Sequence, residues 1–318
     1  QRGKINYRGP FYEALRAILE VDKELESLTL NRKIFFVLAR NAKEYEKDII
    51  PTEKFLEKLR ERKVDVFTFI ERRWCSKPPI THRSWVKEED NIGLLHVVSY
   101  EKWLKDIVKK TRHNMVRKAE RNGIRTTIVE VDKKLIESVW KIYNETPIRQ
   151  KRAFPHYGIS LEAVKHMLLS ENCTNIGAYL QDELVGFAQI VNGNNIAVLA
   201  QLLSLQKHWD KAVNNALVAK AVQLCENKSI KWLMYGRMET AHPSLDSFKR
   251  HNGFSKFPLT RFSIPLTTKG KIAVKLGLHR DLKDALPKSI KYPLIPAYNW
   301  VSRTKIRIKL ALKRFKAP

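Results

Sequence analysis

The sequence contains little cysteine and little glycine. Its three cysteines, Cys75, Cys173 and Cys225, lie far apart and form no C-x-x-C pair. This argues against a disulfide scaffold and a zinc site, and suits a reducing cytosol. Glycine accounts for only 12 of the 318 residues, below the average of about 7%, so few positions can form a glycine-rich phosphate loop. Walker, G-x-G-x-x-G, H-E-x-x-H, RNA-recognition and helix-turn-helix signatures are absent from the sequence. We therefore expect no metal site and no tightly bound cofactor.

Long apolar runs are missing too. No stretch of apolar residues reaches the ~18 that a transmembrane helix needs. The first residues, Gln1 to Lys4, lack the apolar core of a signal peptide, which leads us to expect a cytoplasmic protein. The hydrophobic fraction of 43% is close to the globular average. The 318 residues therefore predict one large or two modest domains with a substantial core.

Acidic residues are scarce, and the excess positive charge is concentrated. The chain has 60 Lys and Arg against 33 Asp and Glu, a formal net charge of +27. Residues 269–318 hold 14 basic and two acidic residues, and residues 101–125 hold nine and three. We expect these two segments to meet phosphates, on tRNA, on a nucleotide-linked substrate or on anionic lipid.

Hydrophobic periodicity predicts an α+β chain. Helices are expected over residues 12–22, 52–62, 100–122, 133–144, 161–169, 211–226 and 245–251. Strands are expected over residues 34–39, 64–70, 94–98, 126–131, 175–180, 184–192, 196–203, 232–235 and 261–265. The strands between residues 175 and 203 are separated by short turns and should form an antiparallel meander.

From residue 126 onward, the order strand, two helices, three antiparallel strands, helix, strand, helix, strand resembles the GNAT acyltransferase fold. Residues 109–124, KKTRHNMVRKAERNGI, resemble the "K-x-R-x-x-I-R-K-A-E-K-x-G-V" helix of the FemAB/FemX-like family. Residues 244–254, SLDSFKRHNGF, resemble that family's late "L-x-x-F-K-x-x-F-G" stretch. The resemblance covers residues 94–265. It implies a mixed, mainly antiparallel sheet flanked by helices, with a second, degenerate GNAT-like or α/β N-terminal half.

We accordingly divide the chain into three parts. Residues 1–98 form the N-terminal half, residues 99–265 a GNAT-like acyltransferase domain, and residues 266–318 a basic extension. Enzymes of the resembled family transfer an aminoacyl group from aminoacyl-tRNA to an amine, typically on a peptidoglycan precursor. Relatives use other activated acyl donors and other amines. The basic extension is outside the family pattern, and Asn252 stands where the family often has an aromatic residue, so the acceptor is not carried over.

The segment before residue 213 is expected to meet the donor. Standard GNAT enzymes hold the coenzyme A pyrophosphate with a Q/R-x-x-G-x-G/A turn at a helix start, where backbone N–H groups meet phosphate oxygens. Residues 206–212 read QKHWDKA, with Trp209 and Lys211 at the glycine positions. These side chains block a close approach, which disfavours ordinary acetyl-CoA binding and favours a tRNA-like or other donor. The activated donor is therefore expected to be an aminoacyl-tRNA-like molecule or an acyl-CoA. Lys207 and Lys211 can still supply positive charge there, unless the segment is simply a solvated loop.

The loop of residues 146–158 holds the best catalytic candidates. An attacking amine must lose a proton, and His156 or Tyr157 can accept it. Arg149 and Arg152 are placed to clamp a carboxylate or phosphate. The alternative is that the aromatic residues anchor the loop while the arginines are solvated.

Further candidates come from the family-like stretches. The resemblance implies that Lys249 lies near the substrate channel, where it and Arg250 can hold an oxyanion or phosphate. Tyr235 and Arg237 end a predicted central strand, where GNAT-like substrate grooves open. The basic helix supplies further phosphate- or tRNA-binding candidates, unless it is only a solvated face. These are Lys110, Arg112, Arg117, Lys118 and Arg121.

Three hypotheses remain open. The first is an acyltransferase in which His156 or Tyr157 moves the proton. The second is a non-catalytic RNA-binding or membrane-surface protein that uses the basic helix and residues 300–318. That tail fits a strand with one basic face, a basic amphipathic helix on an anionic membrane, or a disordered segment. The third is a CoA-dependent acetyltransferase with an altered pyrophosphate loop. No protein partner is inferred.

Overall fold

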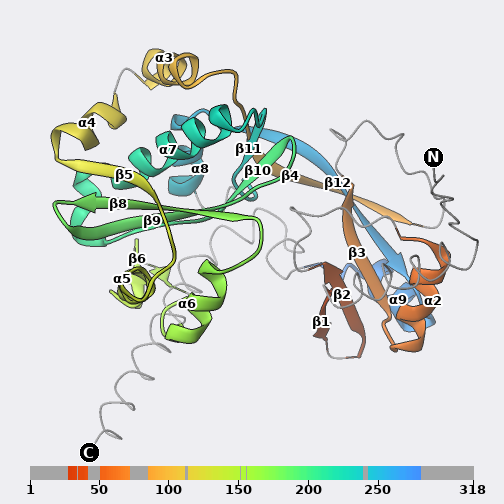
Figure 1. Ribbon diagram of the computed structural model, residues 1–318. Coiled ribbons are helices and arrows are strands. Elements are labelled where there is room, and N and C mark those ends of the chain that lie inside the picture. Colours follow the sequence, from red (N-terminus) through yellow and green to blue (C-terminus); the bar gives the residue numbers. More distant parts are fainter. Residues whose placement is uncertain are drawn as a thin grey trace, which may run out of the picture. The chain divides into compact units, whose positions relative to one another are not determined.

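The computed structural model describes residues 28–33, 35–41, 51–71, 85–111, 114–150, 152–154, 156–238 and 243–280. For residues 108–111 and 152 the description is limited to the backbone. The chain divides into two compact units (Figure 1). The first comprises residues 1–90 and 258–286, and the second comprises residues 91–257 and 287–318. Strands β4 (Val86–His96) and β12 (Ser255–Pro265) contribute residues to both units.

The first unit is built around a buried strand. β1 (Leu28–Arg32) pairs antiparallel with β2 (Val37–Asn41), β2 pairs parallel with β3 (Val66–Glu71), and β3 pairs antiparallel with β12. Every residue of β3 is buried, so both of its faces are covered. Phe67 packs with residues of α2 (Glu53–Glu61), whereas its neighbour Val66 packs with residues of α9 (Thr268–Lys275). Successive side chains of a strand point to opposite faces, so the two helices cover opposite sides of β3.

The second unit holds a six-stranded, mainly antiparallel arrangement. Its strand order is β4-β11-β10-β9-β8-β5, and only β10 and β11 pair in parallel. The other strands are β5 (Ile124–Val129), β8 (Cys173–Leu180), β9 (Glu183–Val191), β10 (Ile196–Ser204) and β11 (Trp232–Met234). A separate two-stranded ribbon consists of β6 (Ile148–Arg149) and β7 (Arg152–Ala153). The α+β class with a mainly antiparallel sheet is confirmed.

Helices cover both faces of this sheet (Figure 1). On one face, α3 (Tyr100–Thr111) and α4 (Met115–Arg121) lie against α7 (Val213–Asn227), which packs on the strands. On the other face lie α5 (Lys133–Tyr143) and α6 (Leu161–Leu168). Local sequence starts α5 and α6, since Asp132 and Ser160 accept hydrogen bonds from Leu135 N–H and Ala163 N–H. The remaining helix, α8 (Pro243–His251), follows β11.

Two helix predictions need correction. The helix expected over residues 100–122 is two helices, because the Asn114 side chain accepts from Arg117 N–H and caps a new one. Its predicted end is confirmed at Gly123, whose φ of 79° suits glycine. The helix expected from residue 211 begins at Val213, after a 3-10 helix η1 (Gln206–Lys211) and a left-handed Ala212. The helix expected over residues 12–22 lies outside the described residues.

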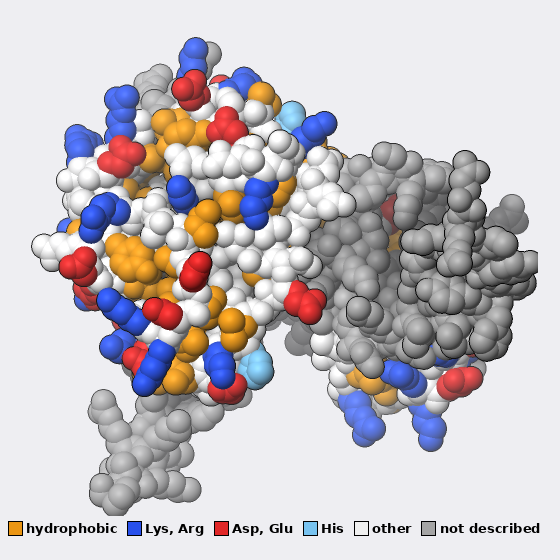
Figure 2. All heavy atoms as spheres, in the orientation of Figure 1, with side chains coloured by type: hydrophobic (Ala, Val, Ile, Leu, Met, Phe, Trp, Pro, Cys, Tyr) orange, Lys and Arg blue, Asp and Glu red, His pale blue; other side chains and the backbone are white. Residues whose placement is uncertain are grey.

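Figure 2 shows basic, acidic and apolar side chains interspersed over one face of the second unit. That face therefore carries no continuous positive surface. Among the described helices, none combines the length and apolarity required to cross a bilayer.

Candidate active site in the second unit

In the second unit, the parallel strands β10 and β11 separate at their carboxyl ends. β10 and β11 pair at three positions only, from Ile196 with Trp232 to Val198 with Met234. Beyond them, Tyr235 N–H donates to Gly93 O and Gly93 N–H donates to Gly236 O, both at 2.8 Å, so this segment stays with β4. Ligands of open sheets bind beyond the carboxyl ends of parallel strands where the chain diverges.

β10 is bulged where this separation begins. Its pairing with β9 shifts between Leu199 and Gln201, which leaves Ala200 without a partner in the β9 ladder. Ala200 also lies past the last residue paired with β11. An unpaired bulge residue offers backbone groups to a ligand, and bulges are frequent next to active sites.

Tyr143, at the end of α5, joins this bulge to the α5–α6 loop. Its hydroxyl donates to Gln201 Oε1 at 2.7 Å. Its ring lies 6.1 Å from that of Phe154 and 6.1 Å from that of His156, both in the loop. Burial raises the pKa of Tyr143, so this phenol stays protonated near neutral pH. Tyr143 therefore acts as a hydrogen-bond donor that fixes Gln201.

His156 is the exposed member of this aromatic cluster. Its ring meets that of Phe154 edge-on at 5.5 Å, and its nitrogens have no hydrogen-bond partner among the described residues. Neighbouring bonds fix the loop, since Gly158 N–H donates to Asn144 Oδ1 and Trp140 Nε1 donates to Ile159 O. The half-buried Tyr157 bonds through its backbone N–H to Phe154 O. The loop thus presents the imidazole of His156 on a supported backbone.

Arg149 has a different place from the one expected. Its side chain is buried, and its terminal nitrogens donate to Ser204 O at 2.8 Å, Ile142 O at 2.6 Å and Glu145 Oε2 at 3.2 Å. Its guanidinium lies 4.8 Å from the centre of the Phe154 ring. These contacts join the end of α5, the end of β10 and the loop. Arg149 is a positioning residue here, not a solvent-facing clamp. The side chain of Arg152 is outside the described residues.

The carboxylate of Glu145 binds the backbone at the start of η1. Its two carboxylate oxygens lie 2.9 and 2.8 Å from Gln206 N, and one lies 3.4 Å from Lys207 N. An adjoining hollow of about 410 Å³ is lined by acids and bases together, among them Lys141, Glu145, Asp182, Glu183 and Lys207. Lys207 Nζ itself binds Glu183 at 2.7 Å, and Lys211 is half-buried at the end of η1. A carboxylate of the chain itself therefore holds the N–H groups at the position matched to the GNAT pyrophosphate turn, which the sequence already disfavoured as a coenzyme A site.

Lys249 of α8 is buried, and its ammonium bonds within the protein. Its Nζ donates to Arg237 O at 2.7 Å and lies 4.8 Å from the centre of the Tyr235 ring. Burial raises the pKa of the Tyr235 phenol. Lys249 thus supports the turn after β11, where Gly236 has a φ of 49°. The exposed Arg250 lies 3.7 Å from Asp246.

The described residues of the basic segment 101–125 that form α3 and α4 lie on the face of the sheet that α7 covers, opposite the loop that carries His156. Arg117 and Arg121 of α4 are exposed, Lys118 is half-buried, and none of them forms an ion pair with a described residue. α4 packs beside α7, whereas the His156 loop follows α5 on the opposite face (Figure 1). The side chain of Lys110, all of Arg112 and residues 300–318 are outside the described residues.

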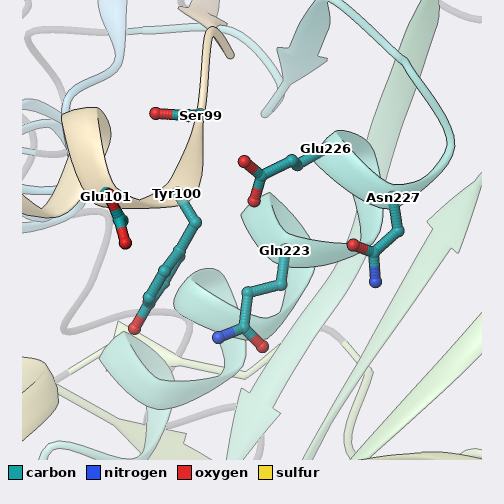
Figure 3. A pocket seen from close by; sticks show the side chains of 6 residues that line it. All are labelled: Ser99, Tyr100, Glu101, Gln223, Glu226 and Asn227. Atoms are coloured by element: carbon teal, nitrogen blue, oxygen red, sulfur yellow. The ribbon is translucent and has the colours of Figure 1, made fainter.

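A second hollow, of about 360 Å³, lies between the start of α3 and the last turns of α7 (Figure 3). Tyr100 reaches into it beside Gln223, and Glu101 and Glu226 line it. Burial and the nearby charge of Glu120 raise the pKa of Tyr100. Two carboxylates make this hollow unsuited to phosphate, and it is at the opposite end of α7 from Gln206.

No protein-family model matches the sequence, and no curated protein is significantly similar to it. Several solved structures are similar in fold. The C-terminal domain of a putative lysylphosphatidylglycerol synthetase from Agrobacterium fabrum has a TM-score of 0.52 at 10% identity, covering 78% of this chain and 83% of that one. L-PGS from Bacillus licheniformis has a TM-score of 0.51 at 10% identity, covering 80% and 84%. FemX has a TM-score of 0.52 at 9% identity, covering 78% and 86%.

The chain has a FemX-like GNAT fold. These similarities cover more of the chain than residues 94–265, to which the sequence resemblance was confined. Within this GNAT fold, β10 and β11 are the strands that separate, and η1 stands where the pyrophosphate turn was expected.

Sequence reasoning missed three residues of the site, namely Tyr143, Glu145 and Gln201. Glu145 precedes Arg149 by four residues, a spacing typical of an ion pair. Nothing local indicates that its carboxylate reaches residue 206. Tyr143 and Gln201 are 58 residues apart, and only the sheet brings them together.

Proposed function

We propose that this protein is an acyltransferase that moves an activated acyl group onto an amine, with His156 accepting the amine proton. The observation that carries the proposal is the separation of β10 and β11 at the Ala200 bulge, next to the loop that presents His156. The GNAT fold supports the reaction class. The proposal extends to the second unit only.

The reaction needs a proton acceptor and a hydrogen-bond donor for the oxyanion from the chain. The amine nitrogen attacks the acyl carbonyl carbon, and its proton passes to the imidazole of His156 as the bond forms. The carbonyl oxygen becomes an oxyanion, which the backbone N–H of Ala200 stabilises. Collapse of the tetrahedral intermediate restores the carbonyl and expels the leaving group, which takes up the proton. No covalent acyl-enzyme is required. Tyr143 and Arg149 fix Gln201 and the loop but do not touch the reacting atoms.

We infer that the donor is held without a pyrophosphate at η1. The Gln206 and Lys207 N–H groups bind Glu145, and a diphosphate at this point would meet a carboxylate of its own charge sign. This favours an aminoacyl-tRNA or a similar ester donor over an acyl-CoA.

A transfer assay tests the proposal. The full chain is incubated with a mixture of aminoacyl-tRNAs, or with acyl-CoAs, and with a panel of amines, and amide products are identified by mass spectrometry. His156→Gln should lower the rate by about 10²-fold or more, the contribution typical of a general base. The control is His166→Gln, because His166 is an exposed histidine of α6 whose ring lies 3.2 Å from Glu162. Equal rates for the two variants would remove His156 from the mechanism.

One observation favours the non-catalytic alternative. Arg117 and Arg121 are exposed on α4 without ion pairs to described residues, on the face opposite His156. They are free to bind the phosphates of an RNA. If Arg117→Ala/Arg121→Ala weakens tRNA binding while no donor ever yields a product, the protein is an RNA-binding module on an acyltransferase fold. Lys133→Ala/Lys134→Ala, two exposed lysines of α5, serves as the matched control.

A further inference from the structure

The first unit contains a hollow of about 690 Å³ whose lining is strongly basic. Five of its lining residues are cationic, namely Arg32, Lys33, Arg60, Lys63 and Lys269, and only one is acidic, namely Asp65. This charge lies outside the site of the second unit and is not used by the proposed reaction.

The acidic residue, Asp65, is hydrogen-bonded within the first unit. The Asp65 carboxylate accepts hydrogen bonds from Val37 N–H at 2.8 Å and from the Thr267 hydroxyl. Arg60 pairs with the exposed Glu53 at 2.8 Å. The other four basic residues form no ion pair with a described residue. Asp65 is committed to the fold, so the positive charge of the hollow is left for a ligand.

Packing brings these residues together from distant segments. The turn between β1 and β2 is closed by Lys33 N–H donating to Phe36 O, and Phe36 is buried with Ala273 and Val274 of α9. The first turn of α9 lies against β3 so closely that a Cβ on Gly270 would come within 1.9 Å of Asp65 O. This contact fixes Lys269 beside the hollow. The basic cluster is therefore held by a core and is not a chance grouping of surface lysines.

Exposed apolar side chains flank the same hollow. Phe35, which lines it, is 41% exposed. Ile272 of α9 and Leu276, the residue that caps its carboxyl end, are 49% and 64% exposed. They follow Lys269 by three and seven residues. That spacing places all three on one side of the helix. Where the first unit is visible in Figure 2, Lys and Arg side chains lie beside apolar ones.

We propose that this surface docks on an anionic membrane, with a lipid phosphate in the hollow and Phe35, Ile272 and Leu276 in the headgroup layer. Basic groups attract the negative leaflet, and exposed apolar groups gain by leaving water at the interface. A nucleic acid would satisfy the cations but leave the aliphatic side chains in water. The surface is made of other residues than the basic tail considered in the sequence analysis, and the proposal does not depend on the proposed function.

Vesicle co-sedimentation of the full chain tests the proposal. The wild type should bind vesicles of phosphatidylcholine mixed with phosphatidylglycerol, and bind phosphatidylcholine alone far less. Lys33→Gln/Lys269→Gln should lower the partition coefficient about 25-fold, since each basic residue near the surface contributes about 1 kcal/mol, or about fivefold. The matched control is Lys271→Gln/Lys275→Gln, two exposed lysines on the other flank of α9, which should cost only a few-fold.

A second pair of variants tests the apolar part. Phe35→Ser/Leu276→Ser should weaken binding to the same vesicles at least fivefold and leave tRNA retention unchanged. Circular dichroism melting curves confirm that each variant is folded. Equal vesicle binding by Lys33→Gln/Lys269→Gln and its control would overturn the proposal. Loss of tRNA retention instead of vesicle binding in Lys33→Gln/Lys269→Gln would also overturn it, and would make the hollow a nucleic-acid site. Hydrogen exchange should slow at residues 29–36 and 268–276 when vesicles are added.

Discussion

Both carboxylate oxygens of Glu145 lie within hydrogen-bonding distance of the backbone nitrogen of Gln206, at 2.9 and 2.8 Å. One of them also accepts from Lys207 N–H at 3.4 Å, and Arg149 binds the same carboxylate at 3.2 Å. The end of α5 thus closes the helix start that a GNAT fold offers to phosphate. In this structure the Gln206 and Lys207 N–H groups therefore have an acceptor within the chain, and Trp209 and Lys211 stand at the glycine positions of the expected turn.

Removing the carboxylate should reopen this helix start. We expect Glu145→Ala to gain thermal stabilisation by acetyl-CoA that the wild type lacks. In the absence of ligand it should lose about 1–3 kcal/mol of unfolding free energy, because two backbone N–H groups lose their acceptor and Arg149 loses one of its three. Differential scanning fluorimetry with and without acetyl-CoA measures both effects. Glu171→Ala, at an exposed position, should change neither. Wild-type protein strongly stabilised by acetyl-CoA would show that Glu145 does not exclude the cofactor.

The Tyr143 hydroxyl should matter for the geometry of the site more than for proton transfer. Tyr143→Phe keeps the ring contacts but removes the 2.7 Å hydrogen bond to Gln201, which should lower the free energy of unfolding by about 1 kcal/mol. Because burial raises the pKa of Tyr143, the wild-type rate should show no titration of this phenol between neutral and mildly alkaline pH. Urea denaturation and a pH–rate profile check these two expectations. A rate inflection near pH 9 that disappears in Tyr143→Phe would contradict the second.

Lys249 should be a stability residue. Lys249→Met fills a similar volume but leaves Arg237 O without the ammonium that lies 2.7 Å away, and we expect a loss of about 1–3 kcal/mol. Arg250→Met, its exposed neighbour, should stay within about 0.5 kcal/mol of wild type, as surface substitutions usually do. Equilibrium urea unfolding distinguishes the two. Full stability of Lys249→Met together with lost activity would contradict this prediction and would support the role near the substrate channel that the family resemblance implied.

The first unit should be acid-sensitive through Glu88. Burial acts to raise the pKa of Glu88, but hydrogen bonds and charge attraction from His279 and Arg280 outweigh it and lower the pKa from 4.5 to about 2. A folded-state pKa below the unfolded value stabilises the fold above pH 4.5, and this stabilisation is lost as the pH falls towards 2. After allowance for solvent screening of the partly exposed Arg280, the contribution is on the order of 1–3 kcal/mol.

Glu88→Gln tests this contribution. The variant should be less stable than wild type at pH 7, and the difference should shrink between pH 4.5 and pH 2, where wild-type Glu88 takes up its proton. Urea unfolding at a series of pH values, followed by far-ultraviolet circular dichroism, gives the measurement. Glu89→Gln, at the exposed position next to it, is the control. A constant difference at every pH would mean that the substitution acts through packing.

Much of the local structure could be predicted from the sequence, because it depends on neighbours along the chain. Apolar runs separated by short turns predicted the three-stranded meander. Residues such as Asp132 and Ser160 start their helices through bonds to amides three residues ahead. Breaks were harder to predict. The apolar stripe of residues 100–122 continues through Asn114, so only the side-chain bond to Arg117 N–H reveals the second helix.

The sequence predicted where the positive charge is concentrated but not which basic residues the fold brings together. The sequence located net positive charge in residues 101–125 and 269–318. It did not indicate that Lys269 would join Lys33 and Lys63 around one hollow, because the turn between β1 and β2 and the helix α9 are distant in the sequence and meet only in the folded core. The same holds for Lys249, whose burial depends on the turn after β11.

The sequence by itself determined the α+β class, the order of the elements and the likeness to GNAT acyltransferases, since periodicity and short motifs are properties of consecutive residues. The tertiary structure decided which polar groups face each other. Glu145 and Gln206 are 61 residues apart, and no local pattern relates them. Their bond forms because the sheet sets the residues after α5 beside the end of β10, where the partly buried carboxylate of Glu145 meets the first N–H groups of η1.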